Sequence, residues 1–216
     1  MAARAHSPRD LRDAVRAAGV ADARVLDAIA ETPREAFVPP EQAWRAYEDV
    51  PVPIPRGQVT TQPSLVARML AGAAPRPEER ALEVGTGYGW QTALLARLAR
   101  AVWSVERFAD LAAAARANLA GQGVAGVEVV VGDGSAGLPE RAPFDVIVVS
   151  AAFPSVPEPL ARQLAPAGRL VQPLGPGGAE DVVLFERTAR GLERRAVLTG
   201  AHFVRLVGRH GFRAEG

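Results

Sequence analysis

The second half of the chain alternates two kinds of segment, and this alternation restricts the folds open to it. From residue 80 onward, apolar runs of strand length are separated by longer segments with helical character. The pattern predicts strands at Ala81–Val84, Ala101–Val105, Val127–Val131, Val146–Ser150 and Gly168–Pro173. It predicts helices at Gln91–Arg100, Phe108–Gly121 and Pro157–Leu164. Strands that are apolar throughout are typical of a parallel sheet covered on both faces, so we expect a doubly wound, mostly parallel α/β sheet.

The segments on either side of this core have different patterns. Residues 7–30 have the spacing of one or two amphipathic helices, and another helix is expected to begin near Pro63. Residues 32–62 between them are rich in proline and aromatic residues, and long irregular segments in compact domains tend to be functional. Residues 179–208 are expected to form antiparallel strands. We expect one domain over 1–216, with a helical and substrate-facing extension at 1–60, a cofactor-binding core at 61–185 and C-terminal strands at 186–216.

Composition excludes several classes of function. The net charge is +1, so no global field favours nucleic acid, and no run reaches the roughly 18 apolar residues of a membrane span. The absence of cysteine excludes disulfides, thiolate metal sites and a cysteine nucleophile. His6, His202 and His210 are scattered, so we expect no metal. The N-terminal residues lack the apolar stretch of a signal peptide, and we expect a cytoplasmic monomer.

Three glycines stand directly after the first predicted strand of the core. Gly85, Gly87 and Gly89 lie where a doubly wound sheet binds its ligand, and glycine lets the backbone approach a ligand closely or adopt a positive φ. The dinucleotide motif GxGxxG would need a glycine at position 90, where Trp90 stands. The observed GxGxG, preceded by Glu83, fits a ligand whose amino-acid part carries an ammonium and a carboxylate, such as S-adenosylmethionine. A merely tight turn is the alternative.

Two acidic residues stand at the ends of the next two predicted strands. Glu106 follows the glycines by about twenty residues, where a carboxylate can accept hydrogen bonds from both ribose hydroxyls. Asp133 and Gly134 follow the third strand, where an aspartate can accept a hydrogen bond from an adenine amino group. Each carboxylate alone could be an ordinary surface group at a strand end. The order of all three features favours a nucleoside ligand.

Longer stretches resemble one family of enzymes. The run LEVGTGYGWQTALLA is similar to the glycine motif of the protein-L-isoaspartate (D-aspartate) O-methyltransferases, and VGDGSAGLPERAPFDVIVVSAAFPSVPEPLARQLAPAGRLVQPLG resembles their long central signature. The segments FVPP, AYEDVPVPI and GQVTTQPSLVARML are similar to an N-terminal region that general methyltransferases lack. The resemblance covers residues 25–185, with a weaker match at HFVRLVG.

This resemblance implies a reaction and a set of partners. A methyl group would pass from S-adenosylmethionine to the free α-carboxylate of L-isoaspartyl residues in damaged proteins, with D-aspartyl residues as further candidates. The ester would collapse to a succinimide, which begins repair. Isoaspartyl-containing proteins are then the partners, with no nucleic acid, membrane or metal. The candidate cofactor-binding residues are Gln58, Val59, Thr60, Glu83, Gly85, Thr86, Gly87, Glu106, Arg107, Asp133 and Gly134.

The substrate side of the site is expected in three segments. The apolar stretch Val50–Gly57 would form a wall that takes the peptide in extended form, unless it is an ordinary packed loop. The candidate substrate-binding residues are Val52, Pro53, Ile54, Ala152, Val204 and Leu206. Arg205 stands where the family commonly has proline, which leaves open whether it attracts a carboxylate or is merely solvated.

Thr61 is the candidate catalytic residue. The family usually has serine in the triplet that is Thr61-Gln62-Pro63 here, and threonine keeps the hydroxyl while adding a methyl group. A backbone α-carboxyl has a pKa of about 3.3–3.7, so the acceptor is ionised at neutral pH and needs positioning rather than a base. We expect Thr61 Oγ1 to donate a hydrogen bond to it. The alternative is that Thr61 caps the helix that begins near Pro63.

Three other functions remain as alternatives at this point. A specialised relative would methylate a normal aspartate side chain in a peptide precursor and drive aspartimide formation. An NAD-dependent oxidoreductase would share the fold but is disfavoured by Trp90 and by the lack of groups for hydride transfer. A non-catalytic module would bind the cofactor without transferring its methyl group.

Overall fold

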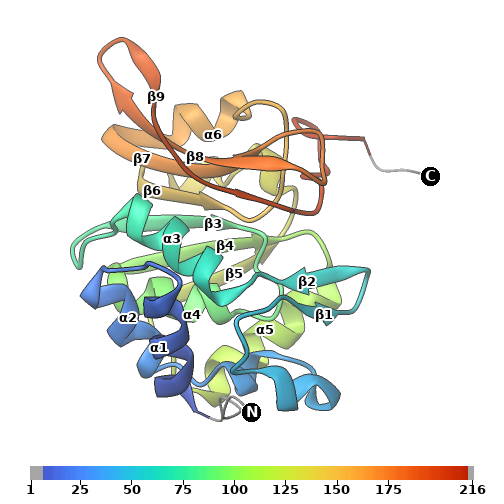
Figure 1. Cartoon of the computed structure of the whole chain (residues 1–216). Helices are drawn as coiled ribbons and strands as arrows, with labels where there is room; N and C mark the ends of the chain where they lie inside the picture. Colours follow the sequence, from blue (N-terminus) through green and yellow to red (C-terminus); the bar gives the residue numbers. More distant parts are fainter. Residues whose placement is uncertain (1–6, 214–216) are drawn as a thin grey trace.

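The computed structural model describes residues 7–213, and a seven-stranded sheet forms its centre (Figure 1). The strand order is β5-β4-β3-β6-β7-β8-β9. The strands are β3 (Arg80–Val84), β4 (Ala101–Glu106), β5 (Val127–Val131), β6 (Phe144–Val149), β7 (Leu164–Leu174), β8 (Glu180–Thr188) and β9 (Gly191–Ala201). The first five are parallel, and β8 and β9 are antiparallel to their neighbours. The doubly wound, mostly parallel sheet expected from the sequence is therefore confirmed.

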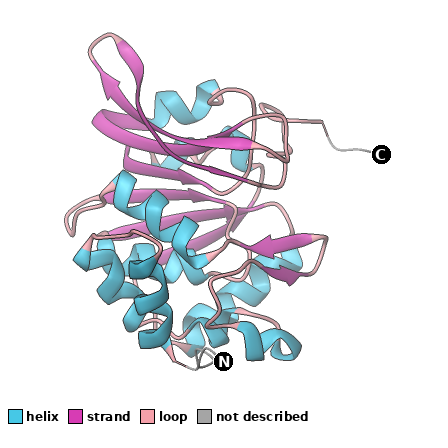
Figure 2. Cartoon of the chain, viewed as in Figure 1, coloured by secondary structure: helices cyan, strands magenta, loops and turns pink. Residues whose placement is uncertain are grey.

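Helices lie on both faces of the sheet (Figure 2). They are α1 (Pro8–Ala17), α2 (Ala23–Ala30), α3 (Pro63–Ala73), α4 (Trp90–Leu98), α5 (Ala109–Gly121) and α6 (Glu158–Gln163). Alternate strand residues face opposite sides: Ala81 and Val146 pack with side chains from α1 to α5, whereas Leu82 and Ile147 pack with Leu160 of α6. This period of two is what strands buried on both faces require. None of the helices within residues 7–213 is long and apolar enough to cross a bilayer.

The proline-rich stretch before α3 contains regular structure that the sequence did not predict. Its elements are the 3₁₀ turns η1 (Arg34–Phe37) and η2 (Pro40–Arg45) and the strands β1 (Val52–Ile54) and β2 (Gln58–Thr60). The two strands pair as an antiparallel hairpin in which Pro53 lies opposite Val59. Arg56 and Gly57 both have a positive φ, 63° and 65°, and form its turn. The sequence did not predict the hairpin because the segment is rich in proline. A residue without an N–H is usually evidence against a strand.

Other helices and strands begin or end at residues that differ from the predicted ones. α4 covers Trp90–Leu98 rather than Gln91–Arg100, and β7 starts at Leu164, which was expected to end a helix. Two further 3₁₀ turns, η3 (Gly134–Ala136) and η4 (Pro139–Arg141), lie between β5 and β6. The boundary expected at residue 185 falls inside β8, which pairs with β7 and β9, and the division of the chain into three parts stays a prediction.

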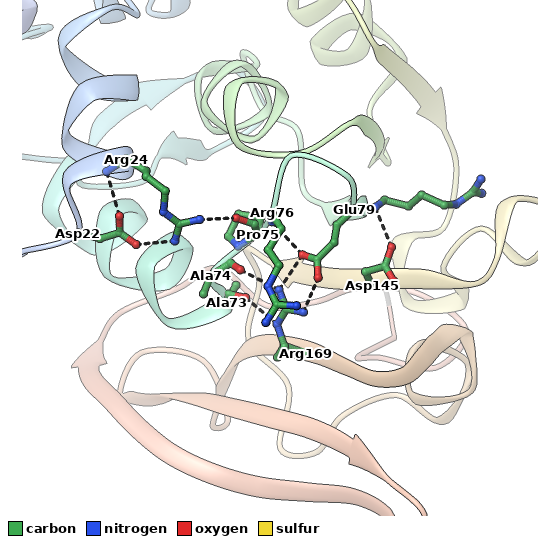
Figure 3. A network of polar contacts seen from close by, with 10 residues as sticks. Asp22, Arg24, Ala73, Ala74, Pro75, Arg76, Glu79, Asp145 and Arg169 are labelled. Atoms are coloured by element: carbon green, nitrogen blue, oxygen red, sulfur yellow. Dashed lines mark hydrogen bonds and ion pairs between the residues drawn. The ribbon is translucent and has the colours of Figure 1, made fainter.

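One arginine of the sheet holds both Glu79, the residue before β3, and the C-terminal end of α3 (Figure 3). Arg169 of β7 donates from Nη1 and Nη2 to the two carboxylate oxygens of Glu79, each at 2.8 Å. Its Nε and Nη2 also donate to the carbonyls of Ala73 and Ala74, at 2.9 and 2.8 Å. A helix leaves its last carbonyls without intrahelical partners, and Arg169 supplies two of the missing donors. The C-terminal end of α3 is thereby fixed, while its N-terminal end reaches the candidate site.

Candidate active site

A cavity lies at the carboxyl ends of β3, β4 and β6, where the chain reverses its direction of travel across the sheet. It contains about 900 Å³ of empty space, its open mouth included. Many of the residues predicted to bind cofactor line it, namely Gln58, Val59, Thr60, Gly85, Thr86, Gly87, Glu106, Arg107 and Gly134, and so does Thr61, the candidate catalytic residue. The candidate substrate residues Ile54, Val204 and Leu206 line it as well. The fold therefore gathers five separate chain segments at one place.

The glycine loop forms the floor of this cavity. Gly85 and Gly87 have φ values of 94° and 57°, a region that side chains rarely adopt. A Cβ on Gly85 would lie 3.4 Å from the Ser150 Cβ, an ordinary contact distance, so the positive φ is what requires glycine here. The loop is fastened to the sheet because the Gly85 N–H donates to the Val105 carbonyl at 2.9 Å. The backbone is thus exposed to a ligand without an intervening side chain.

Glu106 is held at the end of β4 by backbone donors on both sides. Its Oε2 accepts from the Gly87 N–H at 2.9 Å, and its Oε1 accepts from the Phe108 N–H at 3.0 Å. The side chain is 5% exposed and lines the cavity. A carboxylate oriented in this way still has free lone pairs, and it is suited to a ligand that offers hydroxyl donors.

Glu83 lies behind the loop, fully buried, and does not belong to the cavity lining. Its carboxylate accepts from Gln91 Nε2 at 2.9 Å, from Thr92 Oγ1 at 2.5 Å and from Ser104 Oγ at 2.5 Å. Burial is the main influence and raises the pKa of Glu83 to about 7, although these three donors oppose the rise. The structure therefore gives Glu83 the position of a support for the loop, and its predicted contact with a cofactor stays a prediction.

A second cavity adjoins the first and shares part of its wall. Val59, Thr61, Ser150 and Val204 line both. The second cavity runs between the N-terminal end of α3 and the end of β9, over residues 199–204. The side chains that border both spaces are placed to contact a ligand in one and a ligand in the other.

The Thr61 hydroxyl is free to act at this junction. The N-cap of α3 is Gln62 rather than Thr61, and the Ser64 N–H is capped by Asp49 Oδ1 at 2.8 Å. Within residues 7–213 no group hydrogen-bonds Thr61 Oγ1. The helix-capping alternative for Thr61 is therefore wrong, because Asp49, distant in sequence, serves the helix end instead.

A buried arginine fixes the backbone around Thr61. Arg34 is fully buried, and its guanidinium donates to the carbonyls of Ala46 and Glu48, each at 3.2 Å. Its Nη2 also donates to the Val50 carbonyl at 3.0 Å, to Thr60 Oγ1 at 2.8 Å and to the Thr61 carbonyl at 3.3 Å.

The same guanidinium lies 5.3 Å from the ring centroid of Trp90, the residue after the glycine loop. Burial lowers the pKa of Arg34 to about 10, which leaves it charged at neutral pH. One side chain therefore links the N-terminal segment, the end of β2 and the start of α4.

Comparisons with known proteins agree with this geometry. A family model described as Protein-L-isoaspartate(D-aspartate) O-methyltransferase (PCMT) matches residues 6–211. A protein-L-isoaspartate O-methyltransferase of Methanoculleus marisnigri is 50% identical over 202 residues, which are 93% of this chain and 91% of that protein. One from Anaeromyxobacter dehalogenans is 52% identical over 201 residues, 92% of this chain and 96% of that protein. The chain belongs to the protein-L-isoaspartate(D-aspartate) O-methyltransferase family.

Solved structures show the same fold. One protein-L-isoaspartate O-methyltransferase has a TM-score of 0.81 at 28% identity and covers 94% of this chain and 67% of its own. A putative relative from Plasmodium falciparum, solved in complex with S-adenosyl-L-homocysteine, has a TM-score of 0.77 at 23% identity. It covers 94% of this chain and 99% of its own.

Some residues expected to face a ligand in this isoaspartate methyltransferase family member lie elsewhere. Val52 is fully buried in the core, and Pro53 lines neither cavity. Ala152 is also fully buried, and its N–H donates to the Val204 carbonyl at 2.8 Å. Alternation along β1 explains the first two, because a strand that presents Pro53 outward must turn Val52 and Ile54 inward. Of the expected peptide wall, Val50–Gly57, Ile54 lines the first cavity and Pro51 lines the second.

Asp133 is occupied by the C-terminal segment. Its Oδ1 accepts from the N–H and the hydroxyl of Ser135, at 2.9 and 2.6 Å, and its Oδ2 accepts from the Arg209 N–H at 2.7 Å. The side-chain bond from Ser135 and the backbone N–H donors outweigh burial and lower the pKa of Asp133. The carboxylate stands beside Gly134, which lines the first cavity, but is not itself in the lining. Its contact with adenine stays a prediction.

The sequence analysis did not single out several residues that line the first cavity. Gln91 and Ser150 are two polar residues among them. Ser150 follows the last residue of β6, and that position at a strand's carboxyl end was the available signal. Arg205 also lines this cavity; its Nε donates to the Pro176 carbonyl at 3.2 Å and its guanidinium stacks on Phe212. These contacts do not test whether Arg205 attracts a substrate carboxylate or is merely solvated.

The residues of the first cavity fit an S-adenosylmethionine-type ligand. The exposed backbone of Gly85 and Gly87 suits a polar amino-acid part, and the Glu106 carboxylate suits hydroxyl groups. Position 134 leaves no room for a side chain in the present packing, since a Cβ there would lie 2.4 Å from Val84 Cγ1. Within residues 7–213, no three histidine, aspartate or glutamate side chains are grouped to hold a metal ion; His6 lies outside the described residues.

Proposed function

We propose that this chain transfers a methyl group from S-adenosylmethionine to the free α-carboxylate of L-isoaspartyl residues in damaged proteins. The observation that carries the proposal is the position of Thr61, whose hydroxyl has no partner within residues 7–213 and borders both cavities. Membership of the protein-L-isoaspartate(D-aspartate) O-methyltransferase family supports the reaction. Ester formation would be followed by collapse to a succinimide, which starts the repair.

The first cavity would hold the cofactor. Gly85 and Gly87 would take the amino-acid part, Glu106 the ribose hydroxyls, and Gly134 would lie against the adenine. When bound, S-adenosylmethionine supplies a methyl group that the positive sulfur already activates. The residues present need not remove a proton, because the acceptor carboxylate, with a pKa of about 3.3–3.7, is ionised at neutral pH.

Positioning is then the main task of the protein. Thr61 Oγ1 would donate a hydrogen bond to one oxygen of the substrate carboxylate and leave the other oxygen directed at the first cavity. Val59 and Val204 border the same junction and would exclude water from it. Holding two reactants in line is worth about 7–11 kcal/mol of the barrier, so this chemistry needs no nucleophilic or basic side chain.

Exchange of Thr61 tests this role. Thr61→Ala is expected to lower kcat/KM for an isoaspartyl peptide by about 100-fold, because a carboxylate without this bond is no longer held in line with the methyl group. Thr61→Ser keeps the hydroxyl and is expected to retain activity within about threefold. The measurement is transfer of a labelled methyl group, and S-adenosylhomocysteine affinity serves as the control for an intact cofactor cavity. An alanine variant with full activity would show that the hydroxyl is not used.

The same assay separates the other candidate functions. An enzyme that prefers a normal aspartyl peptide would be a precursor-modifying relative, and a chain that binds S-adenosylhomocysteine without any transfer would be a binding module. Binding of NADH in preference to S-adenosylhomocysteine would indicate an oxidoreductase. Acceptance of D-aspartyl residues, a monomeric state and a cytoplasmic location are further parts of the proposal, each open to direct measurement.

A further inference from the structure

One face of α3 forms a side of the second cavity. Ser64, Leu65 and Arg68 of this helix line the cavity, together with Thr61 just before it. Residues three or four positions apart lie on the same face of a helix, so the lining continues along α3 from Thr61 to Arg68. Residues 199–204, from the end of β9 and the stretch after it, form the other side. The cavity contains about 990 Å³ of empty space, its open mouth included.

The lining of this cavity has no negatively charged side chain among the described residues. Arg68 is the only arginine among them, and it forms no ion pair within residues 7–213. His202 also lines the cavity, and its Nδ1 contacts the Gly178 carbonyl. A cavity with a cation and no carboxylate is suited to a ligand segment that carries negative charge.

Arg68 keeps donors for such a ligand. Its Nη2 donates to the carbonyl of Ala18, the C-cap of α1. Its Nε and Nη1 have no acceptor within residues 7–213, and neither is among the buried side-chain atoms that lack a partner, so both are open to solvent. A guanidinium binds a carboxylate with two parallel hydrogen bonds. The bond to Ala18 therefore holds the arginine in place and leaves Nε and Nη1 for a carboxylate.

The spacing between Thr61 and Arg68 matches a short length of extended peptide. A helix rises 1.5 Å per residue, so the seven positions between the two residues span about 10 Å. An extended chain advances about 3.3–3.6 Å per residue, and about three residues cover this distance. A peptide whose isoaspartyl carboxylate lies at Thr61 would therefore bring a side chain two or three residues away to Arg68.

We propose that the second cavity takes the peptide segment that flanks the isoaspartyl residue, and that Arg68 selects an acidic side chain two or three residues from it. This inference rests on the proposed function and names a preferred substrate class for it. An aspartate or glutamate of the peptide is attracted by Arg68 and meets no carboxylate in the lining. A lysine at the same place meets a like charge, so attraction and repulsion both contribute to the selection.

The selection is expected to change KM and to leave kcat unchanged. Arg68 lies about 10 Å along α3 from Thr61, the candidate for contact with the reacting carboxylate. An ion pair so far from the methyl group is the same in the bound substrate and in the transition state. Binding of this uniform kind lowers KM without raising kcat.

Isoaspartyl peptides that differ in one residue provide the test. Glutamate, glutamine or lysine is placed two or three positions from the isoaspartyl residue, on its N-terminal side in one set and on its C-terminal side in the other. Transfer of a labelled methyl group gives kcat and KM. On one of the two sides, we expect the KM of the parent chain to be about tenfold lower for glutamate than for lysine. In Arg68→Met, which keeps the length of the side chain, the two values should differ by less than about twofold.

Two control variants separate this charge effect from a structural one. Arg68→Lys keeps the charge and should keep the preference within about threefold. Arg24 also donates to a carbonyl, that of Pro75, but lines neither cavity, so Arg24→Met should leave the preference unchanged. If Arg68 only supported α1 through Ala18, its replacement would change the KM of every peptide equally, and that result would overturn the proposal. The preference of the parent chain should also shrink in about 0.5 M salt, because salt screens accessible charges.

The other outcomes are also decisive. Equal KM values for glutamate and lysine peptides in the parent chain would overturn this inference and leave the proposed function in place. A preference for lysine, or a preference for glutamate that survives in Arg68→Met, would do the same. Direct binding of the peptides in the presence of S-adenosylhomocysteine separates the two proposals. A preference in binding that depends on Arg68, without methyl transfer, would support the inference and reject only the proposed function, whereas neither binding nor transfer would overturn both.

Discussion

Replacing Arg34 by methionine is expected to lower the free energy of unfolding by about 3–5 kcal/mol. Methionine fills much of the same space, but it leaves the acceptors of the Ala46–Val50 segment, Thr60 and Thr61 without their donor. Each buried acceptor left unpaired costs about 1–3 kcal/mol, and water can reach some of them, so the total is less than the sum. The measurement is urea unfolding at equilibrium.

Two further variants decide whether the effect belongs to this site. Arg24→Met removes an arginine that also donates to a carbonyl, that of Pro75, but is 49% exposed, and we expect a loss below about 1 kcal/mol. Arg34→Lys keeps the charge, but one ammonium group replaces the planar guanidinium that bonds to five acceptors. We therefore expect most of the loss in the free energy of unfolding to remain. A methionine variant as stable as the parent chain would contradict the structural role of Arg34.

The stability of the parent chain is expected to fall by about 3 kcal/mol, relative to Glu83→Gln, as the pH rises from 4.5 to 8. Burial raises the pKa of Glu83 from 4.5 to about 7, so the native state holds this proton more tightly than the unfolded state does. The stabilising effect of the proton is complete below pH 4.5 and is lost as the pH passes through 7. At about 1.4 kcal/mol per pH unit, the difference of about 2.5 units gives the stated magnitude.

The comparison with Glu83→Gln isolates this one group. Glutamine does not titrate, and any constant cost of placing its amide beside Thr92 and Ser104 cancels when only the change with pH is compared. Urea unfolding of both proteins at five or six pH values provides the curves. Parallel curves between pH 4.5 and 8 would mean that Glu83 is already ionised at the lower pH and that its three donors outweigh its burial.

Local pattern was enough to predict the sheet and the glycine loop. Strands such as β3 and β6 are apolar on both faces, and this pattern is visible within five or six residues. Gly85 and Gly87 stand where the backbone must adopt a positive φ, and Glu106 ends β4 as expected for a ligand at the edge of the sheet. These features depend on neighbours in the sequence, so the sequence alone reveals them.

The rest depends on contacts between distant residues. Arg34 resembles a solvated arginine in sequence and is the largest fully buried side chain among the described residues, because most of its acceptors are backbone carbonyls that no residue pattern records. The capping of α3 by Asp49 removed the alternative role of Thr61, and the second cavity exists only because β9 ends beside α3. Such pairings are specified by the folded chain as a whole.

The position of the C-terminal segment has a consequence for protein synthesis. Residues 204–207 line the cofactor cavity, and the Arg209 N–H holds the Asp133 carboxylate beside it. These residues are translated after every other part of that cavity wall, whereas N-terminal parts of a chain can begin to fold during translation. A nascent chain therefore lacks one wall of the cavity until residues 204–207 have been made.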